Sequence, residues 1–112
     1  MKFIVAIIKP FKFEDVRAAL TAVGVTGLTV TEVSGYGRQK GQTEVYRGAE
    51  YTQNMLPKLK LEIAVSDDLA DRVVETLMAS ASSPAIGDGK IFVYELNETV
   101  RIRTAESGEN AL

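Results

Sequence analysis

Glycines and basic side chains alternate in two segments of the chain, a combination suited to holding an anion. Residues 35–41 read Gly-Tyr-Gly-Arg-Gln-Lys-Gly, and residues 87–90 read Gly-Asp-Gly-Lys. Glycine lets backbone amides approach a ligand closely, while lysine or arginine supplies positive charge. Each segment also has a simpler interpretation: a connector with solvated charges, or an Asp-Gly turn before a strand. No Gly-x-x-x-x-Gly-Lys-Ser/Thr pattern occurs, so neither segment is a P-loop.

Two arginines, Arg101 and Arg103, are a third candidate for binding an anion. A spacing of two residues on an extended segment puts both guanidinium groups on one face. Guanidinium groups pair well with phosphate oxygens. The alternative is an exposed edge strand whose charges prevent unwanted pairing. Together with Arg38 and Lys90, the two arginines predict a basic, glycine-lined site for a polyanion such as a nucleoside triphosphate.

Side chains for catalysis are scarce. The chain has no cysteine and no histidine, which excludes disulfides, thiolate zinc sites and nucleophiles that depend on these residues. The acids Glu44, Glu50 and Glu62 have no evident nucleophile or base as a partner. Binding without turnover is therefore favoured. A nucleotide-hydrolysing or nucleotide-transferring enzyme is the rival hypothesis, and Glu62 would be its general base.

The bulk composition indicates one soluble domain that spans residues 1–112. Hydrophobic residues make up 46% of the chain, charged residues 25%, and the net charge is −2, all ordinary values for a globular protein. The basic surplus of a nucleic-acid-binding protein is absent. The first apolar run, residues 3–8, is too short for a signal peptide or a membrane span. We expect a cytoplasmic protein that does not insert into a membrane.

Hydrophobic periodicity predicts the elements that position these segments. A slip in the alternation at Glu32 and Val33 predicts a bulge, Ser66 is placed to cap a helix, and the polar tail 106–112 is expected to be mobile. The order is strand–helix–strand twice, typical of a ferredoxin-like α+β sandwich of two βαβ units with both helices on one face. The predicted strands are 2–9, 28–34, 58–65, 90–95 and 99–103, and the predicted helices are 13–23 and 66 to about 81.

Two parts of this arrangement predict function and assembly. The segment 37–55, between the second and third strands, lacks any sustained period, and loops of such length are usually functional or disordered. We expect it to be a flexible functional loop. The strand 2–9 is apolar on both faces, and each buried side chain of this kind stabilises by roughly 1.5–3 kcal/mol. A bare apolar face would aggregate, so we expect other subunits to cover the face away from the helices.

Four motifs, in order along nearly the whole chain, resemble the PII nitrogen-signalling family. The resemblance implies a homotrimer with nucleotide sites in the three clefts between subunits. It also implies ATP or ADP as ligands and 2-oxoglutarate as an effector beside Mg-ATP. The motifs are residues 35–41, 46–51, 86–92 and 101–104, and the opening residues 6–12 resemble the start of the family as well.

The same resemblance implies roles for single residues. Thr29 and Ala64 would lie near the adenine, and Arg101 and Arg103 would meet the phosphates of the neighbouring cleft. The other implied nucleotide-binding residues are Gly37, Arg38, Gln39, Glu62, Ser83, Gly87, Asp88, Gly89 and Lys90. For 2-oxoglutarate they are Gln39, which would also be the magnesium ligand, the amides around Lys40 and Gly41, and Lys58 at the distal carboxylate.

The resemblance further implies how such a protein signals. Ligands that differ in affinity for two loop conformations select between them, and the loop 37–55 then docks or releases partners. The expected partners are an ammonium transporter of the Amt class, with Arg47 as the pore plug, and enzymes of nitrogen assimilation. Tyr51 lies in the motif that a uridylyltransferase would modify. Position 49 is alanine, so a phosphoserine cannot form there.

Two places depart from the family pattern. Ser82-Ser83-Pro84-Ala85 stands where the family usually has Thr-Gly and a basic residue, and Pro84 removes a backbone amide. Ala105 replaces a usual glycine. Both changes bear on nucleotide affinity and on the preference between ATP and ADP. They leave open an alternative function, a PII-like trimer with an altered cleft and a different effector.

Overall fold

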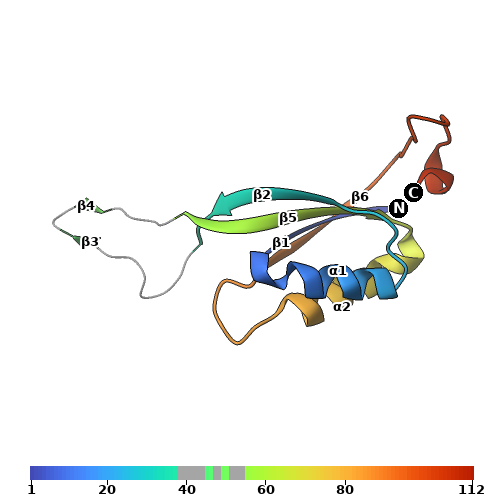
Figure 1. Ribbon diagram of the computed structural model, residues 1–112. Coiled ribbons are helices and arrows are strands. Elements are labelled where there is room, and N and C mark those ends of the chain that lie inside the picture. Colours follow the sequence, from blue (N-terminus) through green and yellow to red (C-terminus); the bar gives the residue numbers. More distant parts are fainter. Residues whose placement is uncertain (38–44, 47–48, 51–54) are drawn as a thin grey trace.

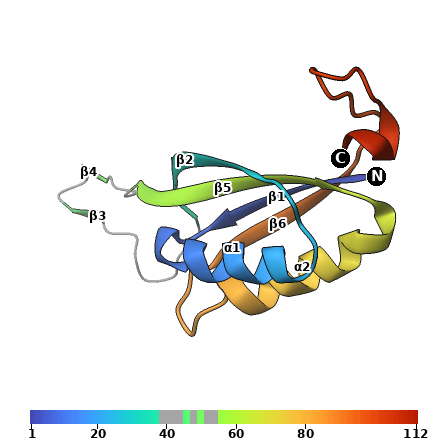
Figure 2. The ribbon, with the colours of Figure 1, turned by 45° about the vertical axis from the view of Figure 1, so that its right-hand side comes forward.

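The computed structural model of the chain describes residues 1–37, 45–46, 49–50 and 55–112. Its centre is an antiparallel four-stranded sheet with the strand order β2-β5-β1-β6, and both α-helices lie on one face of this sheet (Figures 1 and 2). The fold is therefore the ferredoxin-like α+β arrangement that the periodicity predicts. The main strands are β1 (Lys2–Ile8), β2 (Thr29–Gly35), β5 (Leu56–Val65) and β6 (Gly89–Glu95), and the helices are α1 (Phe13–Ala22) and α2 (Asp67–Ala81).

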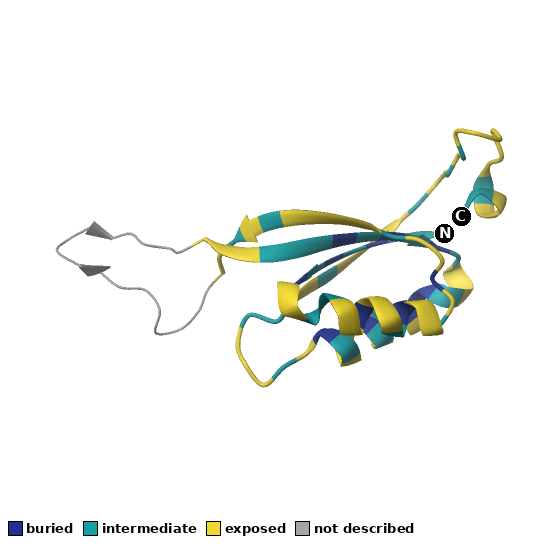
Figure 3. Cartoon of the chain, in the orientation of Figure 1, coloured by how far each residue is buried: buried dark blue, intermediate teal, exposed yellow. Residues whose placement is uncertain are grey.

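The hydrophobic core lies between the sheet and the two helices. In β1 the side chains of Ile4, Ala6 and Ile8, which alternate along the strand and share one face, are buried. Residues of β5 and of the two helices are buried with them and belong to one cluster (Figure 3). The buried members from the other elements are Val16, Leu20, Leu61, Ile63, Val65, Ala70, Val73, Leu77 and Ala81.

The opposite face of the sheet mixes apolar and charged side chains. Directly paired residues of an antiparallel sheet point to the same side, so Val5 shares this open face with its partners Glu62 and Phe92. Phe92 is 43% exposed and Tyr94 is 55% exposed, and Tyr94 packs against Phe3 with 6.4 Å between the ring centroids. Both α-helices lie on the other face of the sheet (Figure 2). Burial of this face against other subunits stays a prediction.

The predicted fifth strand at 99–103 is wrong. Val100 forms only an isolated bridge with Ser107, and residues 102–104 form a turn, closed by a hydrogen bond from the amide of Ala105 to the carbonyl of Arg101. Ala105 adopts a φ of +62°, a conformation that glycine accepts more readily than alanine. Whether such a segment becomes a strand depends on pairing with another strand. This segment does not join the sheet, in which β6 is the edge strand.

The chain after this turn forms one more short element, and its mobility stays a prediction. Gly108–Ala111 forms a short 3-10 helix. It is held by a hydrogen bond from the amide of Gly108 to the carbonyl of Thr99 and by one from Arg101 Nη2 to the carbonyl of Leu112. The end of the chain therefore packs back beside the end of the sheet (Figure 1).

Two local predictions also need correction. Pairing of β2 with β5 is regular throughout, so the bulge at Glu32 and Val33 is absent. Ser66 takes the N-cap position of α2, but its hydroxyl makes no capping hydrogen bond. The segment 37–55 contains two paired strands of two residues each, β3 (Val45–Tyr46) and β4 (Ala49–Glu50).

Candidate functional site

A glycine turn fixes the entrance to β6. The loop that follows α2 reaches β6 through Gly87, with a φ of +92°, and Gly89, with a φ of +117°. A Cβ at position 89 would lie 1.7 Å from the carbonyl oxygen of Ile7. Only glycine therefore lets the start of β6 pass this close to the end of β1. The predicted Gly-Asp-Gly-Lys segment is a tightly constrained turn.

This turn borders a hollow that contains two lysines, Lys58 and Lys90. The hollow has a volume of about 470 Å³, which is within the range of small-molecule sites. Its other lining residues are Ile7, Gly35, Tyr36, Gly37, Leu56, Ile86, Gly87, Asp88, Gly89 and Phe92. Of the predicted site residues, the structure thus brings together Gly37, Lys58 and residues 87–90.

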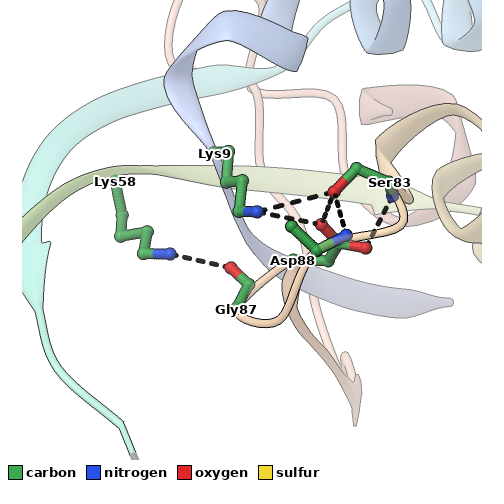
Figure 4. Close-up of polar contacts among 6 residues, drawn as sticks. Lys9, Lys58, Ser83, Gly87 and Asp88 are labelled. Carbon is green, nitrogen blue, oxygen red and sulfur yellow. Dashed lines mark hydrogen bonds and ion pairs between the residues drawn. The ribbon is translucent and has the colours of Figure 1, made fainter. Parts of the chain in front are cut away.

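Lys58 is linked directly to the turn. Its Nζ donates a hydrogen bond of 2.8 Å to the carbonyl of Gly87 (Figure 4). Lys58 lies on β5 opposite Val33 of β2, while Gly87 precedes β6. The hydrogen bond therefore joins two segments that are 29 positions apart in the chain.

A second hollow collects the two residues assigned to the adenine, Thr29 and Ala64, together with Glu62, which was assigned to the nucleotide site. Thr29, Glu62 and Ala64 line it, and its volume is about 590 Å³. Thr29 and Glu62 are paired across β2 and β5. Glu62 is four residues from Lys58, or about 13 Å along a strand, so the two hollows lie at separate places along β5. Glu109, Ala111 and Leu112 from the end of the chain also line this second hollow.

Arg101 and Arg103 do not reach the glycine turn of their own chain. They follow the far end of β6, whereas the turn precedes its near end, and the seven residues of β6 extend over about 20 Å. Arg101 instead pairs with Glu106 at 3.2 Å. The sequence-based expectation that Lys90, Arg101 and Arg103 form one anion site is therefore not met within a single chain.

Ser83 lies behind the turn and is absent from the residues that line either hollow. Its amide donates to Asp88 Oδ2 at 2.6 Å, and its hydroxyl donates to Asp88 Oδ1 at 2.5 Å. These hydrogen bonds, with a smaller contribution from Lys9, lower the pKa of Asp88 below its usual value. Asp88 is therefore an ionised carboxylate at neutral pH, and Ser83 supports the turn (Figure 4).

Lys9 also belongs to this group, although it was not among the site residues predicted from the sequence. Lys9 Nζ lies 3.4 Å from Asp88 Oδ1 and 3.5 Å from Ser83 Oγ. In the sequence, Lys9 was noticeable only as the residue at the end of the first strand. Its proximity to Asp88 depends on the strand register that sets Ile8 opposite Gly89, and this register cannot be obtained from one strand alone.

Some predicted site residues fall outside the part of the chain that the structure describes. They are Arg38, Gln39, Lys40, Gly41, Arg47 and Tyr51. Across the described residues, no group of three acidic side chains is placed to hold a metal ion. No helix within that same part is long and apolar enough to cross a membrane.

The fold and the two hollows define a small ferredoxin-like domain suited to binding a ligand. Residues 1–106 match the family model of the nitrogen regulatory protein P-II. Over all 112 residues of both chains, the sequence is 63% identical to nitrogen regulatory protein P-II of Rhizobium etli, 58% identical to that of Pasteurella multocida and 57% identical to nitrogen regulatory protein GlnK of Escherichia coli strain K12. The chain belongs to the nitrogen regulatory protein P-II family, so the family prediction from the motifs is confirmed.

Proposed function

We propose that the protein is a nitrogen-responsive signalling regulator that binds ATP or ADP and, together with Mg-ATP, 2-oxoglutarate. The observation that carries this proposal is the glycine turn 87–90, which borders a hollow with Lys58 and Lys90. Backbone amides of such a turn and two ammonium groups suit phosphate and carboxylate oxygens. In this proposal the protein binds nucleotide without converting it, and it acts through its partners in the cytoplasm.

The nucleotide cleft in this proposal is shared between two chains. One chain supplies the turn 87–90, and the next supplies the adenine-side hollow with Thr29, Glu62 and Ala64. The chain that supplies this hollow also supplies Arg101. The guanidinium of Arg101 donates a hydrogen bond to the carbonyl of Leu112, and Leu112 lines the same hollow. The separation of these two groups within one chain supports a shared cleft. Gln39 is the proposed magnesium ligand and lies outside the described residues.

Signalling in this proposal depends on the loop 37–55. Occupancy of the cleft selects among conformations of the loop, and the loop docks onto an ammonium transporter of the Amt class or onto enzymes of nitrogen assimilation. Arg47 is the proposed contact in the transporter pore, and Tyr51 is the proposed site of uridylylation. The short strands β3 and β4 lie within this loop.

The assembly is expected to be a homotrimer. Light scattering at micromolar concentration should give three times the chain mass of 12.2 kDa, because Phe92 and its apolar neighbours on the open face need a cover. Phe92→Asp should yield monomers, since it places a charge in that face. The matched control is Phe11→Asp, because Phe11 is 72% exposed and belongs to the short 3-10 helix Pro10–Lys12, which is not part of the sheet. A monomeric wild type, or an intact trimer with Phe92→Asp, would refute this assembly.

Adenine nucleotides are expected to raise the melting temperature. A ligand that binds only the folded protein stabilises it by about 2.7 kcal/mol at 100 times its Kd, which corresponds to about 10 °C for a domain of this size. Differential scanning fluorimetry with ATP, ADP and AMP measures this, and AMP should give the smallest shift because it has one phosphate. If none of the three changes the melting temperature, the altered cleft with a different effector becomes the better hypothesis.

A further inference from the structure

Lys9, Ser83 and Asp88 contact one another behind the glycine turn. Of these three residues, Lys9 is not yet part of the proposed site. Asp88 is the only residue of the turn with a side-chain carboxylate, and it borders the hollow that would receive phosphates. A carboxylate beside a polyphosphate raises the energy of the bound state, because like charges repel. Some positive charge must offset this repulsion if the turn is to hold phosphates.

Lys9 is placed to supply that charge. Its ammonium lies 3.4 Å from Asp88 Oδ1, and the side chains of Lys9 and Asp88 are only 18% and 27% exposed. Figure 4 shows Lys9 reaching Asp88 and Ser83 from the end of β1, while Lys58 reaches Gly87 separately. Lys9 is also absent from the residues that line the hollow. Its charge therefore acts on the carboxylate behind the turn, and the hollow's own lysines are left to face a ligand.

The same contacts fix the shape of the loop. Asp88 accepts two hydrogen bonds from Ser83, and Ser83 Oγ in turn accepts one of 3.2 Å from the amide of Ala85. Lys9 attaches this closed ring to β1, next to the place where Gly89 passes Ile7. The ammonium group of Lys9 thus has two effects: it neutralises Asp88, and it holds the ring of hydrogen bonds against the sheet.

We propose that Lys9 is a positioning residue for polyphosphate binding, which neutralises Asp88 and anchors the loop 82–88 behind the phosphate-binding turn. This inference rests on the proposed nucleotide-binding function. It predicts that Lys9 and Asp88 are energetically coupled in nucleotide binding, and that this coupling grows with the charge of the nucleotide. A purely structural support would affect the affinity for all nucleotides equally.

The test compares Lys9→Gln with Lys12→Gln, which removes the same charge three positions away. Isothermal titration calorimetry in EDTA measures affinity for ADP and ATP. Lys9→Gln should weaken ADP binding about tenfold, the loss expected for a charged hydrogen bond, and should weaken ATP binding by a further factor of about three because of its extra charge. Lys12→Gln should bind both nucleotides as the wild type does, and Lys9→Arg should restore most of the affinity.

A double-mutant cycle with Asp88→Asn completes the test. In that background the carboxylate is absent, so Lys9→Gln should have little further effect on affinity. Equal losses for ADP and ATP, or the same loss with and without Asp88, would overturn the inference. Wild-type protein that binds neither nucleotide would refute the proposed function itself, so the two failures are distinguishable. Melting temperatures of all variants identify any that fail to fold.

Discussion

Replacing Lys58 with alanine is expected to abolish measurable 2-oxoglutarate binding while ADP binding falls only modestly. A hydrogen bond to a charged group contributes about 1.5–3 kcal/mol, so loss of the ammonium that faces a carboxylate should lower affinity by up to about a hundredfold. Lys58 also donates to the carbonyl of Gly87 on the turn. A bond of this kind is worth about 0.5–1.5 kcal/mol net, and its loss should weaken ADP binding by a factor of about two to ten.

The matched control for this variant is Lys60→Ala. Lys60 lies two residues further along β5 on the same face, opposite Thr31, and it is not among the residues that line the hollow with Lys58. Calorimetry with saturating Mg-ATP should show 2-oxoglutarate binding to the wild type and to Lys60→Ala, and none to either without nucleotide. Equal losses of ADP and 2-oxoglutarate in Lys58→Ala would contradict the role assigned to Lys58.

Replacing Gly89 with alanine is expected to destabilise the protein severely. The added Cβ would lie 1.7 Å from the carbonyl oxygen of Ile7 and 2.8 Å from its carbonyl carbon. These are backbone atoms of β1, so relief requires β6 to move away from the pairing of Gly89 with Ile8. A φ of +117° adds strain for any residue with a side chain. We expect a loss of about 3 kcal/mol or more in the free energy of unfolding.

Urea denaturation and the melting temperature measure this loss, and Gly27→Ala is the matched control. A Cβ at position 27 would have no atom within 4 Å, so that variant should differ from the wild type by less than about 0.5 kcal/mol. Gly89→Ala should melt more than about 12 °C lower and should lose nucleotide binding, because the turn changes its path. A Gly89→Ala protein with normal stability and affinity would show that the contact with Ile7 is not a real constraint.

The sequence predicted the fold from patterns within single segments. The alternation in β1 separated Ile4, Ala6 and Ile8 from the residues of the other face, and the structure shows that these three face the core. In α2, Val73, Leu77 and Ala81 recur at a helical spacing and are buried as well. Such patterns repeat every two residues or about every 3.6, so they can be read without knowing what packs against them. The family was equally visible, because its motifs are short runs of adjacent residues.

Predictions failed where the outcome depended on a partner distant in the sequence. The segment 99–103 has a strand-like composition, but it has no neighbouring strand and forms a turn closed by Ala105 and Arg101. Pro57 was placed before the third strand, yet β5 includes it. This is possible because β1 pairs with β5 only from Leu59 onward, so Pro57 has a strand on one side only.

By itself the sequence determined the fold class, the alternation of side chains along the strands, the family and the small set of segments that hold glycine beside a basic residue. The tertiary structure alone decided which of them meet: Lys58 and Gly87 share a hollow, Lys9 pairs with Asp88, and Arg101 lies at the other end of β6. The reason is physical. Side-chain periodicity is set by local backbone geometry, whereas the meeting of two segments depends on strand register and on where the chain returns to the sheet.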